Sequence, residues 1–299
     1  MDSYREVKVE GCIIRITNPE KLLYPEASIS KWDYVLSCVQ LSPYLLRYTT
    51  KRLLTMIRYP NGIHQPYFYQ KNVPAPYPEW VHTKKMGEIE YILLDNLPTL
   101  VWLANLACLE FHTSFHYHWK ESPTELVFDL DPSTSDFQKV VEVALETKKV
   151  LECLNLVCYV KTSGASGLQI YVPIQSGYTF EETRRVNYFI AKYLTERLPD
   201  LVTIHRKVRE RGEKVYFDYL QHWRGKTIVT PYSPRATIQA TVSTPVEWEE
   251  LAKLESPEVF TLKTIHKRLE EKGDLFLPLI EGPRTDLSEI LNFLQRHEL

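Results

Sequence analysis

One stretch of sequence, residues 126–174, decides the fold class: LVFDLDPSTSDFQKVVEVALETKKVLECLNLVCYVKTSGASGLQIYVPI. It opens with an apolar strand that ends at a proline, and residues 135–154 then carry apolar side chains at helical spacing. Two further apolar strands, residues 156–163 and 168–174, flank the turn GASG, which is typical of a hairpin. Strand, helix and hairpin in this order predict a mixed α+β fold with a βαβ-β core.

The chain before residue 120 predicts a smaller N-terminal α/β half that packs against this core. We expect one short strand over Val7–Ile16 and a helix from Lys31 to Arg47 with Ser30 as its N-cap. The other expected elements are strands over 53–60, 66–72 and 110–119 and a helix over 98–109, followed in the second half by a helix over 180–198, a basic loop over 205–214 and strands over 215–220 and 226–233.

Composition excludes several classes of protein. The 299 residues contain 36 Lys and Arg against 38 Asp and Glu, a net charge of −2, so any nucleic-acid binding must be local. The longest apolar stretch, residues 91–111, includes Asp95 and Glu110 and is too polar to cross a membrane. No signal peptide is visible, and the five cysteines lack CxxC spacing, as reduced thiols do. We therefore expect a cytoplasmic protein without a membrane partner.

Three aspartates are the strongest candidates for chemistry. Asp129 and Asp131 lie two apart in an apolar strand, so both carboxylates point to one face. Asp218 stands in the second apolar segment VYFDY. Two like charges so close are costly unless a cation such as Mg²⁺ or Mn²⁺ neutralises them, and three carboxylates can hold two such ions for displacement at phosphorus. Alternatively, the first two face water at a strand end and Asp218 pairs with Arg224 or Lys214.

The turn between the two later strands is a candidate phosphate cradle. Gly164 and Gly167 permit tight turns with exposed N–H groups, and Ser163 adds a hydroxyl. The turn is not a Walker loop, and a plain hairpin explains it equally well.

Local basic and aromatic residues suggest contacts with phosphates and bases. The loop HRKVRERGEK, with Arg206 and Lys207, directly precedes the Asp218 segment, although a solvated loop would look the same. Arg58 and Arg235 are further anion candidates, and Phe68 and Tyr69 are flat surfaces of the kind that stack on bases. A zinc site on His112, His116 and His118 is an alternative use of one strand face, but ligands from one strand seldom converge.

Seven strings occur in an order and spacing that resembles the polymerase domain of bacterial ATP-dependent DNA ligase D, within the archaeo-eukaryotic primase superfamily: ITNPEKLLYP, IRYPNGI, FYQKN, FDLDP, KTSGASGLQIYVPI, DYLQHWRGKTIVTPYSPR and VSTPVEWEEL. The resemblance covers about residues 10–260. It implies a primase-polymerase fold with an RRM-like core, in a single domain over 1–299. Residues 1–120 would contact the DNA 5′-phosphate and template, and 121–299 would form the catalytic half.

The resemblance also implies an activity and its setting. The activity is template-directed nucleotidyl transfer, with a preference for ribonucleotides, that fills gaps and extends ends during non-homologous end joining. The implied partners are gapped or broken double-stranded DNA with a 5′-phosphate, NTP or dNTP, two Mn²⁺ or Mg²⁺ ions, the end-binding protein Ku and an ATP-dependent DNA ligase. The implied location is the nucleoid of a bacterium or archaeon. No KxDG nucleophile motif is present, so end sealing would come from a separate or fused ligase.

Site residues are implied by the same match, position by position. Asp129, Asp131 and Asp218 match the catalytic metal ligands. The positions that match near the nucleotide are Ser163, Gly164, Gly167, Gln169, His112, Lys226 and Arg235. The positions that match near DNA are Lys21, Lys31, Phe68 and Tyr69. From their basic character we also expect Arg58 to contact the nucleotide and Lys71, Arg206 and Lys207 to contact DNA.

Two departures from the family turn SGxKGxH predict weaker nucleotide binding. Ser166 replaces the lysine and Gln169 replaces the histidine, so a charged contact becomes a neutral one. The altered turn leaves one rival function open, a non-catalytic module that recognises 5′-phosphates at DNA ends. A second rival, a two-metal nuclease, would use the same three aspartates.

Overall fold

The structure, a computed structural model, describes residues 3–297. These residues form two compact units. Unit 1 contains the described residues up to Ser114 together with Thr227–Ser243 and Glu258–Gly273. Unit 2 contains Phe115–Lys226, Thr244–Pro257 and the described residues from Asp274 onward.

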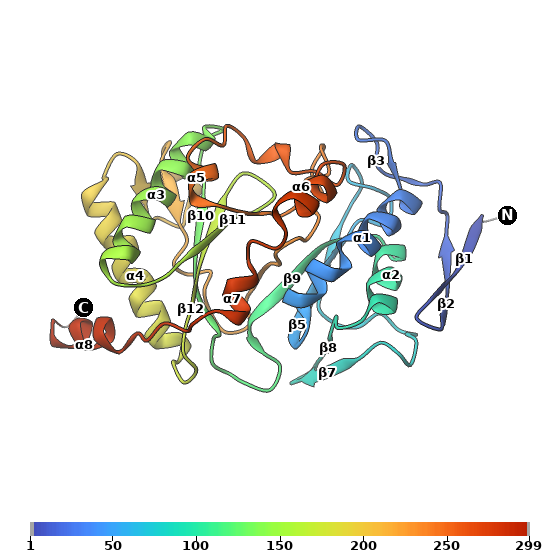
Figure 1. Ribbon diagram of the computed structural model, residues 1–299, viewed down its shortest axis with the longest axis horizontal. Helices are drawn as coiled ribbons and strands as arrows, with labels where there is room; N and C mark the ends of the chain where they lie inside the picture. The colour runs from blue at the N-terminus through green and yellow to red at the C-terminus, as the bar shows by residue number, and fades with distance from the viewer. Residues whose placement is uncertain (1–2, 298–299) are drawn as a thin grey trace. The chain divides into compact units, whose positions relative to one another are not determined.

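Unit 2 is built on a six-stranded sheet in the order β13-β14-β10-β12-β11-β16. Its strands are β10 (Glu125–Asp131), β11 (Tyr159–Thr162), β12 (Leu168–Pro173), β13 (Val202–Thr203), β14 (Val215–Phe217) and β16 (Pro245–Val246). Helices α3 (Phe137–Cys153) and α4 (Phe180–Arg197) pack against the strands, and Figure 1 shows them together on one side of β10 and β12. The chain order β10, α3, β11, β12, α4, β14 confirms the mixed α+β class.

Local chemistry explains where these elements begin. Asp136 caps α3 by accepting a hydrogen bond from the backbone of Gln138 at 3.1 Å. Thr179 and Glu182 form a capping box at the start of α4. All six residues of β12 are buried, and the central strand β10 is buried except at its aspartates, as expected for strands covered on both faces.

Unit 1 contains a four-stranded sheet in the order β15-β9-β5-β6. Its strands are β5 (Arg52–Arg58), β6 (Phe68–Gln70), β9 (Cys108–Tyr117) and β15 (Thr227–Val229). Helices α1 (Lys31–Thr49) and α2 (Leu97–Asn105) lie side by side (Figure 1). Three strand pairs complete this part: β1 (Tyr4–Val9) with β2 (Cys12–Thr17), β3 (Leu22–Tyr24) with β4 (Ile29–Ser30), and β7 (Thr83–Met86) with β8 (Ile89–Ile92).

Short elements form the rest of the described chain. They are 3₁₀ turns at Val208–Glu210 and Pro257–Val259 and helices α5 (Trp248–Leu251), α6 (Ile265–Lys272), α7 (Leu277–Glu281) and α8 (Ser288–Arg296). Within residues 3–297, no helix has the length and apolar character needed to cross a membrane.

Three expectations about the elements need correction. Val7–Ile16 is not one strand, because Glu10 and Gly11 have positive φ and turn the chain into the β1–β2 hairpin. The helix expected to end at residue 109 ends at Asn105. Two residues later, Ala107 has a positive φ, which turns the chain before β9 begins. Asp218 lies one residue beyond β14, not inside a strand. The helix with Ser30 as N-cap is confirmed, including a capping box with Asp33.

Candidate metal centre and nucleic-acid contacts

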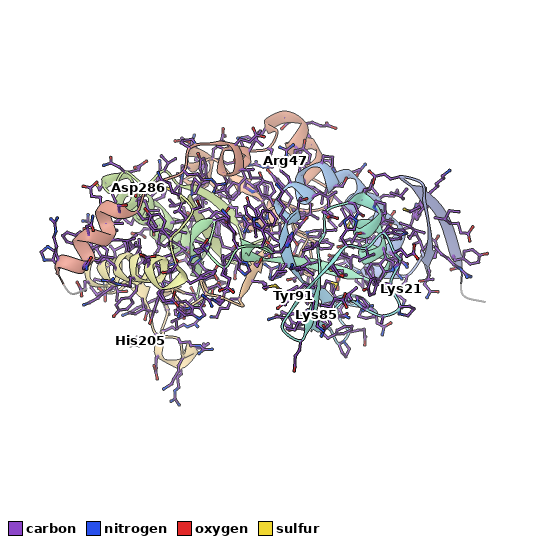
Figure 2. All side chains as sticks on the ribbon, turned by 90° about the horizontal axis from the view of Figure 1, so that it is seen from below. Lys21, Arg47, Lys85, Tyr91, His205 and Asp286 are labelled. Atoms are coloured by element: carbon purple, nitrogen blue, oxygen red, sulfur yellow. The ribbon has the colours of Figure 1, made fainter. Side chains whose placement is uncertain are left out.

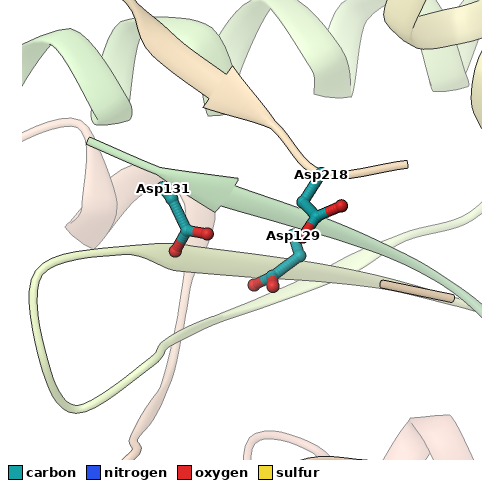
Figure 3. A group of neighbouring side chains, drawn as sticks. All are labelled: Asp129, Asp131 and Asp218. Carbon is teal, nitrogen blue, oxygen red and sulfur yellow. The ribbon is translucent and has the colours of Figure 1, made fainter. Parts of the chain in front are cut away.

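The three aspartates meet in space at one end of the unit 2 sheet. Figure 3 shows Asp129 and Asp131 projecting from the same side of β10, with Asp218 beside them directly after β14. One carboxylate oxygen from each residue lies within 4.8 Å of the others. The backbone explains the approach, because the N–H of Asp218 donates to the carbonyl of Asp129 at 2.9 Å.

Neighbouring groups fix the carboxylates of Asp218 and Asp129. The Tyr216 hydroxyl and the Leu220 N–H both donate to Oδ1 of Asp218, at 3.0 and 3.1 Å. The Gln169 amide donates to Oδ1 of Asp129 at 3.0 Å. These contacts are neutral hydrogen bonds, so they orient the carboxylates without supplying a positive charge.

Electrostatics at the triad favour a bound cation. Burial raises the pKa of Asp129 well above its ordinary value, and the charges of Asp131 and Asp218 raise it further. Gln169 and, more weakly, Lys161 oppose this shift but do not overcome it. An all-oxygen donor set with excess negative charge suits hard divalent ions such as Mg²⁺ and Mn²⁺. The residues therefore fit a metal site.

The turn from Ser163 to Gly167 lies against this site. Ser163 Oγ accepts hydrogen bonds from the N–H groups of Ala165 and Gly167, at 3.2 and 3.1 Å, so its hydroxyl shapes the turn. A side chain on Gly167 would place a Cβ 2.5 Å from the carbonyl of Leu130 and 3.2 Å from Oδ1 of Asp131. Only glycine allows the turn to approach β10 this closely, while Gly164 needs its positive φ of 73°.

Lys226 and the basic loop connect to the same region of unit 2. The Lys226 ammonium donates to the carbonyl of Leu220 at 2.8 Å and so ties down the segment after Asp218. The guanidinium of Arg211 lies 3.7 Å over the ring of Tyr216, whose hydroxyl holds Asp218. Arg206 and Lys207 are exposed, and Figure 2 shows the adjacent His205 in a loop that projects from the helices of this unit.

Lys21 and Lys31, ten residues apart in sequence, are neighbours in unit 1. The β3–β4 pair closes with the N–H of Lys31 donating to the carbonyl of Lys21 at 2.8 Å. The Lys21 ammonium donates to the carbonyl of Pro60 and to Oδ1 of Asn61, at 3.2 and 3.0 Å. Burial, then the charges of Lys21 and Arg58, lower the pKa of Lys31 to about 8. Three cations thus lie close enough to act on one another, and such a group favours an anionic ligand.

The two candidate stacking residues, Phe68 and Tyr69, are neighbours in strand β6 and point to opposite faces. Phe68 is the cross-strand partner of Arg58, whose guanidinium lies 5.2 Å from its ring centre. Tyr69 is next in the strand and therefore points to the opposite face, where its ring contacts Tyr67 edge-on. Phe68 thus contacts Arg58, whose charge acts on Lys31, whereas Tyr69 lies on the opposite face of the strand. Lys71 directly follows β6.

His112 and Arg235, expected near the nucleotide, converge on an acid that the sequence did not single out. Glu110 lies on β9, and its Oε2 is 3.0 Å from both Arg235 Nε and His112 Nε2. A signal was present in the sequence, because Glu110 and His112 lie two residues apart and therefore share one face of a strand. The alternative zinc site on His112, His116 and His118 is not formed: among residues 3–297 the only cluster of at least three potential metal ligands is the aspartate triad.

Comparison with known proteins identifies the family. A model described as "LigD, primase-polymerase domain" matches residues 30–276. The chain belongs to the LigD primase-polymerase domain family. This is a family of nucleotidyltransferases, and the resemblance inferred from the motifs is confirmed.

Similar proteins support the same family. The bifunctional non-homologous end joining protein LigD of Bacillus subtilis is 37% identical over 286 residues, which cover 95% of this chain and 47% of the relative. The corresponding Mycolicibacterium smegmatis protein is 33% identical, over 91% of this chain and 37% of the relative. The chain therefore spans about half of these relatives or less.

A solved structure supports the fold. The polymerase domain of Mycobacterium tuberculosis ligase D, determined in complex with DNA, matches with a TM-score of 0.81 at 28% identity. The match covers 89% of this chain and 97% of that chain. This primase-polymerase family thus accounts for both the motif order and the sheet that carries the aspartates.

Proposed function

We propose that the chain is a template-directed nucleotidyltransferase that extends or fills DNA ends during non-homologous end joining. The observation that carries this proposal is the convergence of Asp129, Asp131 and Asp218, with oxygens within 4.8 Å of one another, in a member of the LigD primase-polymerase family. We take residues 1–299 as one polymerase domain of the primase-polymerase type, with an RRM-like core. Residues 1–120 would serve mainly DNA and residues 121–299 mainly catalysis.

The aspartates would hold two divalent ions, Mn²⁺ or Mg²⁺. When bound, such ions lower the pKa of an attacking hydroxyl and stabilise charge on a departing pyrophosphate. The chain supplies the ligands and their orientation: Tyr216 fixes Asp218, and Gln169 fixes Asp129. The Ser163–Gly167 turn, which approaches Asp131 closely, would contact the phosphate oxygens of the nucleotide. Nucleotide contacts are further assigned to His112, Lys226, Arg235 and Arg58.

The cation cluster of unit 1 would receive the 5′-phosphate of a gap or break. Burial, and then the charges of Lys21 and Arg58, lower the pKa of Lys31, and a bound dianionic phosphate would oppose both effects. A phosphate contact of this kind sets the position of the enzyme on DNA without reading sequence. Phe68, Tyr69, Lys71, Arg206 and Lys207 would contact the DNA strands.

The wider setting is part of the same proposal. The substrates would be gapped or broken duplex DNA together with NTP or dNTP, with ribonucleotides preferred. The partners would be Ku and an ATP-dependent DNA ligase, and the protein would act in the cytoplasm at the nucleoid. Membranes play no part in this scheme.

Primer extension tests the proposal. The substrate is a gapped duplex with a 5′-phosphate on the downstream strand, incubated with Mn²⁺ and each NTP or dNTP. We expect templated addition that Asp129→Ala or Asp131→Ala reduces by at least about a hundredfold, because charge stabilisation at phosphorus is lost. Full activity in either variant would reject the metal role, and shortening of the primer would indicate a nuclease.

A second function, a non-catalytic end-binding module, is favoured by one observation. The Lys21 and Lys31 cluster is complete, whereas the phosphate turn has Ser166 in place of the family lysine. Tight binding of 5′-phosphorylated gapped DNA by the wild type without any incorporation would establish this function instead.

A further inference from the structure

Glu110 is a buried acid of unit 1 to which the proposed function assigns no role. It lies on β9 between Leu109 and Phe111, which are both fully buried, and it is itself 5% exposed. A carboxylate in such surroundings is stable only when other groups satisfy its charge and its lone pairs.

Three groups from two separate segments satisfy the Glu110 carboxylate. Oε2 lies 3.0 Å from Nε of Arg235 and 3.0 Å from Nε2 of His112, and Oε1 accepts the N–H of Ala236 at 3.2 Å. His112 is two residues away on β9, while Arg235 and Ala236 follow β15. The acid therefore contacts two side chains, His112 and Arg235, that are far apart in the sequence.

Burial decreases from the acid to its two partners. The Glu110 side chain is 7% exposed, whereas those of His112 and Arg235 are 16% and 18% exposed. Ligands approaching from solvent would therefore meet the imidazole and the guanidinium before the carboxylate. A carboxylate repels phosphate, so any effect of Glu110 on a phosphate ligand must act through these two side chains.

The backbone around Arg235 is fixed independently of the acid. The N–H of Arg235 donates to the carbonyl of Thr241 at 2.8 Å, and Pro234 and Val242 form a β-bridge. His112 is the cross-strand partner of Val229 on β15. Because both backbones have their own restraints, loss of the Glu110 charge should release side chains without unfolding the segment.

We propose that Glu110 is a positioning residue that holds His112 and Arg235 side by side as a paired donor for the phosphates of the incoming nucleotide. This inference rests on the proposed function, which assigns these two residues to the nucleotide. It adds the reason why a histidine and an arginine from distant segments act together.

The ionisation of Glu110 agrees with this role. Burial alone would raise the pKa of Glu110, but the hydrogen bond from His112 and the charge of Arg235 outweigh burial and lower the pKa to about 2. The other titratable groups that face the acid are Tyr24, Tyr59 and Tyr69, whose pKa values burial raises first and Glu110 raises further. Glu110 thus remains charged throughout the range in which a polymerase would be assayed.

Glu110→Gln tests the inference, because it keeps the shape of the side chain and removes its charge. We expect the KM for nucleotide to rise about tenfold, with kcat changed by no more than about twofold, since a charge-assisted contact becomes a neutral one. We also expect the ring-nitrogen NMR resonances of His112 to move in the metal-free protein. Glu125→Gln is the matched control, because Glu125 is 4% exposed and lies 3.9 Å from Arg284 in unit 2.

A double variant separates positioning from a structural role. Arg235→Gln leaves the buried carboxylate with one cation fewer, and adding Glu110→Gln removes that imbalance. The double variant should regain melting temperature, while its nucleotide KM should rise by no more than about twofold beyond Arg235→Gln alone. Another full tenfold rise would mean that Glu110 does not act through Arg235, and would overturn the inference.

Two further results separate this inference from the proposed function. An unchanged KM and unchanged His112 resonances in Glu110→Gln, with a loss of melting temperature like that of Glu125→Gln, would show a structural role only. Absence of primer extension by the wild type would reject the proposed function. Calorimetric titration of Mn²⁺ and a nucleoside triphosphate, compared between wild type and Glu110→Gln, would still decide the role of Glu110.

Discussion

Two acids, the buried Glu110 in unit 1 and the partly exposed Asp129 in unit 2, have opposite electrostatic surroundings. Glu110 is held by Arg235, His112 and a backbone N–H, and the pKa of this carboxyl falls to about 2. Asp129 is partly exposed and lies beside Asp131 and Asp218, and its pKa rises well above the ordinary value. Burial raises the pKa of both carboxyls, so the difference between them comes from their neighbours.

The comparison shows which site the chain completes by itself. The groups that stabilise the Glu110 charge, Arg235 and His112, belong to the same chain, so removing the acid leaves these side chains without it. At Asp129 the chain supplies further negative charge, so the site is complete only when a cation arrives from solution. An acid with raised pKa among other acids is thus the better indicator of a ligand site.

The largest expected effect is that removing the charge of Glu110 and removing the charge of Asp129 change the free energy of unfolding in opposite directions. Without metal at pH 7, Glu110→Gln should lower the free energy of unfolding by about 2–3 kcal/mol, because Arg235 loses its buried counter-charge. Asp129→Asn should instead raise it by about 1 kcal/mol, because one of three repelling charges disappears. Urea unfolding of both variants and the wild type measures these changes, and a shift of the same sign in both would contradict the comparison.

The pH dependence of these two acids sharpens the contrast. Glu110 has a pKa below its ordinary value of 4.5, so its stabilising effect is present above pH 4.5 and is lost as pH falls toward 2. Asp129 has a pKa above its ordinary value of 3.8, so its charge lowers stability as pH rises through and beyond that value.

Added metal should reverse the effect at Asp129 alone. We expect Mn²⁺ to raise the melting temperature more at pH 8 than at pH 5, since protons compete with the ion at the lower pH. Asp129→Asn should reduce the increase, whereas Glu110→Gln should leave its size unchanged. Calorimetry with and without Mn²⁺ at both pH values measures this, and an equal increase at pH 5 and pH 8 would count against a raised pKa.

Much of unit 2 could be predicted from sequence because its signals are local. The apolar run containing Asp129 and Asp131 fixes both a strand and the face of its carboxylates. Periodicity likewise located α4 to within a few residues, and in unit 1 the Ser30 cap and periodicity located α1. The position of Asp218 beside Asp129 could not be predicted from local sequence in the same way, because it depends on the pairing of β14 with β10.

Contacts between distant segments were not predictable in this way. The sequence around Glu110 does not predict its contact with Arg235. The Gln169 amide was expected to donate to an oxygen of the nucleotide. In the structure that amide donates to Asp129, because Gln169 is the cross-strand partner of Asp129 on β12. Strand register decides such contacts, and register depends on the whole sheet.

Lys31 provides the opposite of the Asp129 case, a buried cation among cations. With its pKa lowered to about 8, Lys31 should lose its charge as pH rises above 8, and bound phosphate should oppose that loss. We expect the preference for 5′-phosphate over 5′-hydroxyl gapped DNA to fall about tenfold in Lys31→Gln, and to decline between pH 7 and pH 9 in the wild type. Fluorescence anisotropy with both DNAs measures this preference.

A matched lysine controls for general charge. Lys85 is exposed on β7 of the same unit (Figure 2), and Lys85→Gln should weaken binding of both DNAs equally, if at all. Loss of the 5′-phosphate preference in Lys85→Gln to the same extent as in Lys31→Gln would show that net charge, not the buried cluster, is responsible.

The smallest expected effect concerns Gln169, which links the acidic triad to the phosphate turn. Gln169→His restores the family residue and should lower the apparent nucleotide Kd by about threefold, because a histidine can place a charged donor toward the triphosphate. The same change removes the amide that orients Asp129, so the metal-induced rise in melting temperature should become smaller. Nucleotide titration and calorimetry on one variant therefore measure opposite consequences. An unchanged nucleotide affinity together with an unchanged metal effect would mean that the 3.0 Å contact between Gln169 and Asp129 has no part in either site.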